Sequence, residues 1–167
     1  MNLNESIRNP KVNLMTQFTY ENLLREVEET KGDVKDSLLR ISEAAGAESD
    51  WHDNSAFDFA NIQHDVNSSK LGTTESKLKN VKIIRPSFGT DVVAIGNSVV
   101  VKFQNETEEK TFTILGPADS GRNQGWISFE SPLGSNLIGK KGGEEVSFSI
   151  HNQKQKLKIL KILPGDF

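Results

Sequence analysis

Two aspartates, Asp50 and Asp53, lie three residues apart in the polar segment 48–57. Residues at this spacing share one side of a helical turn, and a pair of carboxylates suits a hard divalent cation such as Mg2+. Two carboxylates alone bind Mg2+ weakly, so another molecule has to supply the remaining ligands. The segment is therefore a candidate for metal-dependent chemistry that a partner completes.

The same segment also suits a structural role. Ser49 or Asp50 has the side chain of a helix N-cap, and acids in the first turn of the following helix oppose its macrodipole. A cap needs only one side chain, whereas here Trp51 and His52 accompany the acids. Metal binding and capping both remain open at this point.

Two amphipathic patterns flank the segment and predict the helices that position it. The first alternates spacings of 3 and 4 residues through Tyr20, Leu24, Val27, Lys31, Val34, Leu38, Ile41 and Ala45. The second continues this spacing through Phe57, Ala60, His64, Asn67, Leu71, Thr74, Leu78 and Val81. A competing phase of the second pattern consists of Phe59, Ile62 and Val66. Two such seams joined by a short turn bury each other in an antiparallel helical hairpin, with the candidate site at its tip.

Composition narrows the class of protein. The chain has 167 residues, a net charge of -3 and no cysteine, so a disulfide framework, a thiolate nucleophile and a Cys-type zinc site are excluded. No apolar run has the length of a membrane span, and residues 1–12 lack the apolar core of a signal peptide. We expect a cytoplasmic protein without membrane association. Net acidity also argues against electrostatic binding to a phosphate backbone as the main activity.

The second half of the chain has the pattern of short strands. Apolar residues alternate with polar ones at Val99, Val101 and Phe103, at Phe112 and Ile114, at Val146, Phe148 and Ile150, and at Leu157 and Ile159. Ser131 and Pro132 suit the N-cap and first position of a helix over 132–138, the only helix expected here, and Gly139 suits its end.

These patterns predict an α+β fold in three parts. Residues 1–15 form a disordered tail, residues 16–84 a coiled-coil hairpin, and residues 85–167 a small antiparallel β domain with one short helix. The first 84 residues carry 10 basic and 14 acidic side chains, and the rest carry 10 and 9. The acidity therefore belongs to the helical half.

Motifs in both halves resemble the Gre-type transcript cleavage factors of bacterial RNA polymerase. Residues 50–57, Asp-Trp-His-Asp-Asn-Ser-Ala-Phe, resemble the family's tip sequence Asp-Leu-x-Glu-Asn-Ala-Glu-Tyr, with Asp53 in place of the first Glu. Residues 127–134, 137–140 and 143–146 are similar to the family's Ile-Ser-x-x-Ser-Pro, Leu-Gly-Lys and Gly-Asp-x-Val motifs. The resemblance covers about residues 16 to 163.

The resemblance implies a division of labour between the two parts. The β domain would be FKBP-like and dock on the rim of the polymerase's secondary channel, and the hairpin would enter the channel. Asp50 and Asp53 would be the catalytic, metal-binding pair, helping to hold a second Mg2+ near the nascent RNA 3′ end. Tip support would come from Trp51, His52, Asn54, Ser55 and Phe57. Docking would use Glu130, Ser131, Pro132 and Leu133.

The chain would then be a monomeric accessory factor, and the polymerase itself would be the enzyme. Two other functions remain open. A regulator with the same fold would bind the channel and inhibit or modulate the polymerase without cleavage. A peptidyl-prolyl isomerase would follow from the FKBP-like domain, and it would need an apolar pocket lined by aromatic residues.

Overall fold

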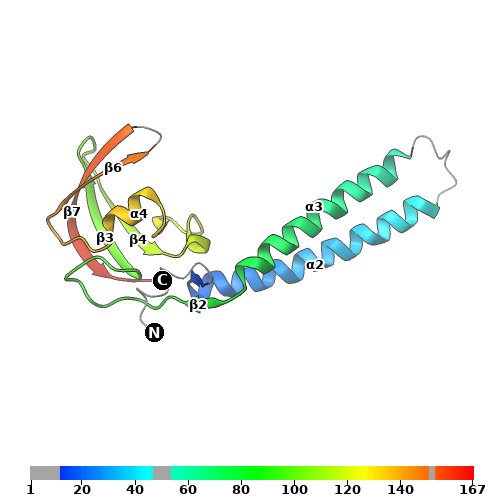
Figure 1. Ribbon diagram of the computed structural model, residues 1–167, viewed down its shortest axis with the longest axis horizontal. Coiled ribbons are helices and arrows are strands. Elements are labelled where there is room, and N and C mark those ends of the chain that lie inside the picture. Colours follow the sequence, from blue (N-terminus) through cyan, green and yellow to red (C-terminus); the bar gives the residue numbers. More distant parts are fainter. Residues whose placement is uncertain (1–11, 47–53, 151–152) are drawn as a thin grey trace. The chain divides into compact units, whose positions relative to one another are not determined.

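A computed structural model describes residues 12–46, 54–150 and 153–167 (Figure 1). The chain divides into two compact units. The helical unit is Glu21–Lys79, and the sheet unit combines the described residues up to Tyr20 with Asn80–Phe167. Neither long helix in the described ranges has an apolar stretch that would let it cross a membrane.

Two long helices lie side by side as a hairpin, α2 over Gln17–Gly46 and α3 over Ser55–Lys77 (Figure 1). Near the tip, Asn54 Nδ2 donates to the carbonyl of Ala44 at 3.0 Å. Farther from the tip, Ser37 Oγ lies 3.2 Å from His64 Nδ1. Residue numbers rise along one helix as they fall along its partner, so the predicted antiparallel hairpin is confirmed.

The buried stripe of α2 differs from the predicted seam at alternate positions. Val27 is buried as predicted, but Leu23 is completely buried where Leu24 was expected, and Leu24 is 42% exposed. Further along, Ser37 is buried and Leu38 is exposed. Ser37 satisfies its hydroxyl by donating to the Val34 carbonyl and by pairing with the histidine across the seam. At both places the apolar pattern predicted that the second of two adjacent residues is buried, whereas the first one is. The pattern missed this because the seam also buries small polar residues.

On α3 the predicted register is confirmed up to Thr74. Ala60 and Thr74 are buried, and the seam residues between them are at least half-buried. The competing phase, Phe59, Ile62 and Val66, is exposed. The helix itself ends at Lys77, so Leu78 and Val81, the last two residues of the predicted seam, lie beyond it. One residue in this exit, Asn80, has φ of 51°, a left-handed conformation that a helix does not continue.

A short parallel pair of strands joins the two chain segments that precede and follow the hairpin in the sequence. Strand β1, Asn13–Met15, pairs with β2, Val81–Ile83. The prediction placed residues 13–15 in a disordered tail, and this is wrong because Leu14 is 2% exposed and Met15 is completely buried. Three residues are too short for a visible alternation, so the sequence did not reveal the strand.

The main sheet has five strands in the order β5-β4-β3-β7-β6. They are β3 (Asn97–Phe103), β4 (Glu109–Leu115), β5 (Trp126–Ser128), β6 (Glu145–Ile150) and β7 (Gln153–Pro164). The sheet was predicted to be antiparallel, but it is mixed, because β5 pairs with β4 in parallel. The connection between β4 and β5 contains the 3-10 helix η1, Pro117–Asp119, which brings the chain back in the same direction.

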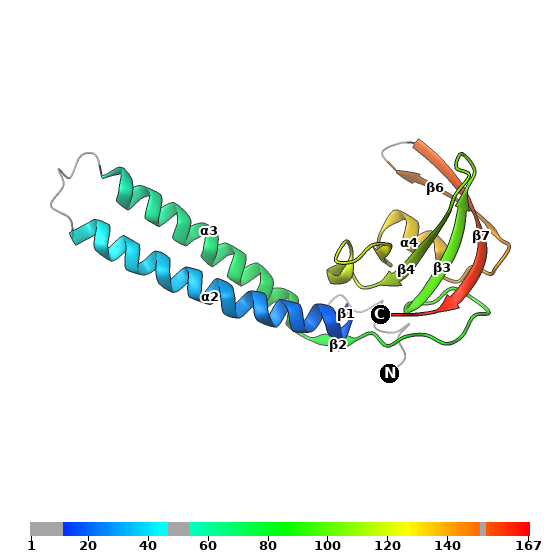
Figure 2. The same cartoon turned by 180° about the vertical axis from the view of Figure 1, so that it is seen from behind.

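One face of this sheet carries the core of the unit. The predicted inward residues Val99, Val101, Ile114 and Ile159 are all completely buried. Helix α4, Pro132–Leu137, contributes Leu137 to the same cluster. Figure 2 shows α4 within the curl of the sheet. Among the described residues of the sheet unit itself, no helix covers the other face (Figure 2).

Candidate functional site

The hairpin tip is held by Asn54, which uses both ends of its amide. Its Oδ1 accepts from the backbone N–H of Phe57 at 3.1 Å, which makes Asn54 the N-cap of α3. Its Nδ2 donates to the carbonyl of Ala44 near the end of α2. One side chain therefore caps one helix and ties it to the other.

This geometry corrects the capping alternative. The sequence offered Ser49 or Asp50 as the cap, but α3 begins at Ser55 and its cap is Asn54. The local signal was present, since Asn54 is a strong capping residue and Asp58 stands in the first helical turn. With the cap supplied by another residue, capping no longer accounts for the acids of the segment.

The predicted chemical groups of the tip, Asp50, Trp51, His52 and Asp53, lie outside the described residues. Their positions in the sequence are still informative, because they belong to the link between Gly46 at the end of α2 and the cap of α3. Of the remaining tip residues, Ser55 is exposed and Phe57 is half-buried. Both residues lie in the first turn of α3, and neither carries a carboxylate or an imidazole.

A hollow of about 590 Å³ lies beside the helices below the tip. Asp33, Asp36 and Glu43 line it together with a single cation, Arg40. Negative charge therefore continues from the tip along the hairpin, as the composition of this half predicted. Such a surface favours cations and repels phosphate groups.

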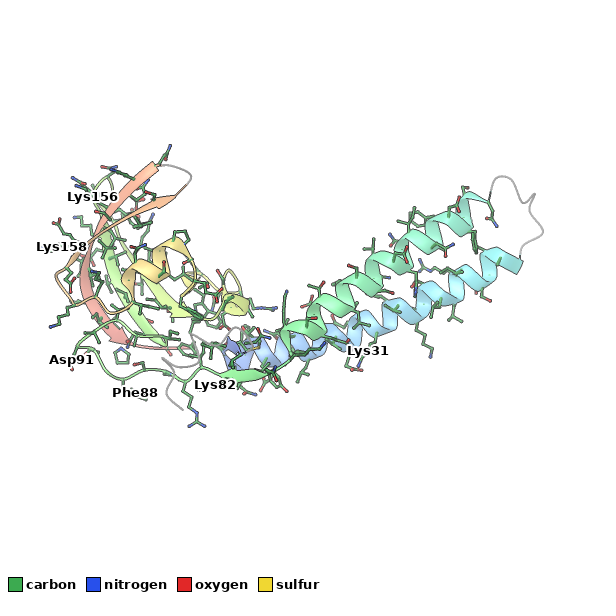
Figure 3. All side chains as sticks on the ribbon, in the orientation of Figure 1. Lys31, Lys82, Phe88, Asp91, Lys156 and Lys158 are labelled. Carbon is green, nitrogen blue, oxygen red and sulfur yellow. The ribbon has the colours of Figure 1, made fainter. Side chains whose placement is uncertain are left out.

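The cation Lys31 on α2 is already engaged (Figure 3). Its Nζ donates to Glu28 Oε1 at 3.0 Å, and this hydrogen bond, with the attraction between the two charges, raises the pKa of Lys31. Both side chains are exposed, so solvent screens the pair.

The predicted docking segment is built around Ser131. Its Oγ accepts from the Gly134 N–H at 3.0 Å and donates to the Ser128 carbonyl at 2.7 Å, and Pro132 follows as the first helical residue. This confirms the predicted N-cap of α4. A Cβ at Gly134 would lie 2.1 Å from the Ser128 oxygen, so only glycine permits this tight turn.

The cap leaves other side chains of the segment accessible. Glu130 and Pro132 are exposed, and Ser131 and Leu133 are half-buried. The turn thus presents a carboxylate and a rigid apolar ring on a fixed backbone. Ser131 is committed to the turn, so of the four predicted docking residues it has the clearest structural role.

A metal site is not formed by the described residues alone. They contain no cluster of three or more His, Asp or Glu side chains with suitable geometry. Asn54 Oδ1 already accepts from the Phe57 N–H as the cap of α3. The predicted metal-binding pair, Asp50 and Asp53, lies outside the described residues.

Known proteins match both halves of the chain. A family model described as "Transcription elongation factor, GreA/GreB, C-term" matches residues 88–164. The transcription elongation factor GreA of Bacillus velezensis is 30% identical over 152 residues, which cover 91% of this chain and 97% of that protein. GreA of Caldanaerobacter subterraneus is 35% identical over 149 residues, covering 87% and 95%. A crystal structure of GreA factor homolog 1 from Thermus thermophilus is 20% identical, covers 89% and 96%, and has a TM-score of 0.40.

The extent of these sequence matches includes the hairpin, the tip segment and the sheet unit. At 30% identity over nearly the full length of both proteins, a common family is established. The chain belongs to the GreA/GreB family of transcription elongation factors.

Proposed function

We propose that this chain binds RNA polymerase and stimulates the polymerase's own cleavage of backtracked transcripts. One observation carries the proposal. The two helices of the hairpin are closed by Asn54 and Ala44, and the short link between them contains Asp50 and Asp53. In the sequence the link joins the ends of an acidic hairpin, which supports a role for its carboxylates in a partner's active site, and the sheet unit supplies a separate surface for docking.

The roles follow from this separation. Glu130 and Pro132, both exposed on the turn before and at the start of α4, suit contact with the polymerase. Asp50 and Asp53 would help to hold Mg2+, which polarises phosphate oxygens and makes bound water a better nucleophile. The phosphodiester is cleaved in the polymerase, so the chain itself is an accessory factor and not an enzyme.

Neutralising the tip acids tests the function. Asp50→Asn or Asp53→Asn is expected to lower stimulated cleavage by roughly a hundredfold, the scale for losing one group that stabilises charge in a transition state, and to leave polymerase binding intact. The assay measures RNA shortening in a stalled, backtracked complex of the cognate polymerase. Asp65→Asn, an exposed acid on α3, is the matched control and should retain full activity.

Two outcomes of this assay separate the alternative functions, and one further variant tests the tip motif. Parallel loss of binding and cleavage would place the main contact at the tip and contradict the assigned roles. Binding without cleavage by the unmodified chain would favour a regulator that occupies the channel. Asp53→Glu, which restores the family's residue, should preserve or raise activity.

Metal binding gives a second test. The isolated protein is expected to bind Mg2+ only weakly, because two carboxylates leave most of the octahedral shell to water. Calorimetry of the free chain should detect no binding at low micromolar Mg2+. Tight stoichiometric binding would contradict this proposal, since it would require a complete site within the chain.

The isomerase alternative draws no support from the sheet unit. Three of its aromatic residues, Trp126, Phe129 and Phe148, are buried in the core and are not available to line an open pocket.

A further inference from the structure

The face of the main sheet opposite α4 carries a row of lysines. In β7 the exposed residues Lys154, Lys156 and Lys158 alternate with buried or half-buried ones, so they share this face. At about 3.4 Å per residue, neighbouring lysines of the row stand about 6.8 Å apart. Figure 3 shows Lys156 and Lys158 pointing outward from β7 on the side away from α4.

Two further lysines extend the row. Lys102 of β3 lies directly opposite Lys158, and both are exposed. The pairing of β3 with β7 shifts between Val100 and Val101, so one residue of β7 is left out of the pairing. After this shift Lys161 pairs with Val100, and its side chain lies on the same outer face as the other lysines. We call these five residues, Lys102, Lys154, Lys156, Lys158 and Lys161, the lysine face.

The lysine face has few counter-charges. Its acidic neighbours on the adjoining strands are Glu109, opposite Lys102, and Glu145, opposite Lys158. The neighbours of Lys156 and Lys154 on β6 are Ser147 and Ser149. In the described part of the chain no salt bridge is formed by any lysine of this face. Its net charge is positive although the whole chain has a net charge of -3.

The face also contains a shallow hollow. It has a volume of about 280 Å³, and its polar lining consists of Lys102, Lys156 and Lys158 with Gln104 and one carboxylate, Glu145. The three cations of the hollow outnumber its one carboxylate, so the wall keeps a net positive charge and suits an anion with several acceptor oxygens. Phosphate fits this description, and lysine binds it as a point charge without requiring a fixed angle.

We propose that the lysine face binds the phosphate backbone of single-stranded RNA. Four of its lysines follow one strand, so the charges form a line that matches a single flexible polyanion better than a duplex, whose phosphates lie on two strands. An acidic polypeptide would need carboxylates at matching spacing, whereas a nucleic acid carries a phosphate at every residue. This surface is distinct from the hairpin tip, and the proposal is independent of transcript cleavage.

The test uses the full-length free protein and a fluorescent single-stranded RNA of about 12 nucleotides, within the usual site size for such surfaces. Anisotropy at about 50 mM salt should detect binding, and the triple variant Lys102→Gln, Lys156→Gln, Lys158→Gln should weaken it roughly tenfold or more. Each lost phosphate contact on a single strand lowers the slope of log affinity against log salt by about 0.7, so the slope should fall by about 2.

The matched control removes the same charge elsewhere. Lys70→Gln, Lys77→Gln, Lys141→Gln alters three exposed lysines off the face and should retain the affinity within about twofold. Lys→Arg at the three positions of the lysine face should also retain binding. This second variant separates loss of charge from loss of folding.

Several outcomes would overturn the proposal. The first is that the protein does not bind RNA at low salt. The second is that the triple Gln variant of the lysine face and the control triple variant weaken RNA binding equally. The third is that the protein binds polyglutamate more tightly than RNA. Tighter binding of a duplex DNA of equal length would assign the face to double-stranded nucleic acid and overturn the choice of RNA. The triple Gln variant of the lysine face keeps Asp50 and Asp53. Its RNA binding can therefore be measured separately from its stimulation of transcript cleavage.

Discussion

Asp119 is a completely buried carboxylate, and at the scale of single residues it is the most constrained acid of the sheet unit. It accepts from the Thr16 N–H at 3.0 Å, from Thr16 Oγ1 at 2.7 Å and from the Gly116 N–H at 3.0 Å. Thr16 immediately follows β1, so these bonds join the start of the described chain to η1. Burying this carboxylate is tolerated because these three groups donate hydrogen bonds to it.

Replacing this carboxylate should destabilise the sheet unit. Asp119→Asn removes the charge and turns an NH2 group toward donors, at an expected cost of about 2–3 kcal/mol in the free energy of unfolding. Urea denaturation followed by Trp126 fluorescence, in a Trp51→Phe background, measures it. Trp126 reports on this unit because it is 8% exposed and packs edge-on against Phe18.

The control for this substitution is Asp91→Asn. Asp91 is exposed, and the same chemical change there should alter stability by less than about 0.5 kcal/mol. Equal shifts in the two variants would contradict the role assigned to the buried carboxylate.

At the scale of elements, the hairpin seam is unusually polar. Ser37 faces His64 across it, and the Thr30 hydroxyl is buried without a hydrogen-bond partner among the described residues. Small polar side chains allow the helices to approach but contribute less apolar burial than leucine. The few large apolar residues of the seam therefore carry much of its stability.

The register of α2 can be tested with two adjacent leucines. Leu23→Ala should destabilise the protein by about 2–4 kcal/mol because it empties a completely buried position. Leu24→Ala, at a position that is 42% exposed, should cost less than about 1 kcal/mol. Urea denaturation followed by far-UV circular dichroism compares them. The reverse order would support the seam predicted from the sequence.

At the scale of the whole molecule, the sheet unit is assembled from both ends of the chain. Leu14 in β1 belongs to its core cluster, and β1 pairs with β2. At Gly116 a Cβ would come within 1.7 Å of the Leu14 carbonyl oxygen, which shows how closely the two segments approach. The helical unit is thus an insertion between β1 and β2 in the chain.

This arrangement predicts which fragment folds well. A fragment of residues 80–167 should be less stable, by at least about 2 kcal/mol, than a chain in which residues 21–79 are replaced by a Gly/Ser linker, because only the second keeps Leu14 and the Thr16 bonds. A linker of about eight residues spans about 15 Å on average. Urea denaturation of the two proteins gives the difference, and equal midpoints would show that β1 contributes nothing.

The same linker protein separates docking from tip chemistry. It retains Glu130 to Leu133 and should compete with the full-length chain for the polymerase without stimulating cleavage. Failure to compete at concentrations well above those at which the full-length chain binds would move the main contact onto the hairpin.

The sequence by itself determined the two-part organisation, the hairpin, most strands of the sheet and the cap of α4. These features depend on local periodicity and on capping residues, which neighbouring positions are enough to encode. The tip motif and the motifs around Ser131 also placed the chain in its family, and the matches to GreA confirm that assignment.

Tertiary structure decided the rest. Leu23 is buried and Leu24 is exposed because of what lies across the seam, and a 3/4 spacing of apolar residues does not contain that information. Strand β1 and the parallel pairing of β5 need partners far away in the sequence. The lysine face is completed only when β3 pairs with β7, since Lys102 and Lys158 are 56 residues apart in the chain and opposite each other in the sheet.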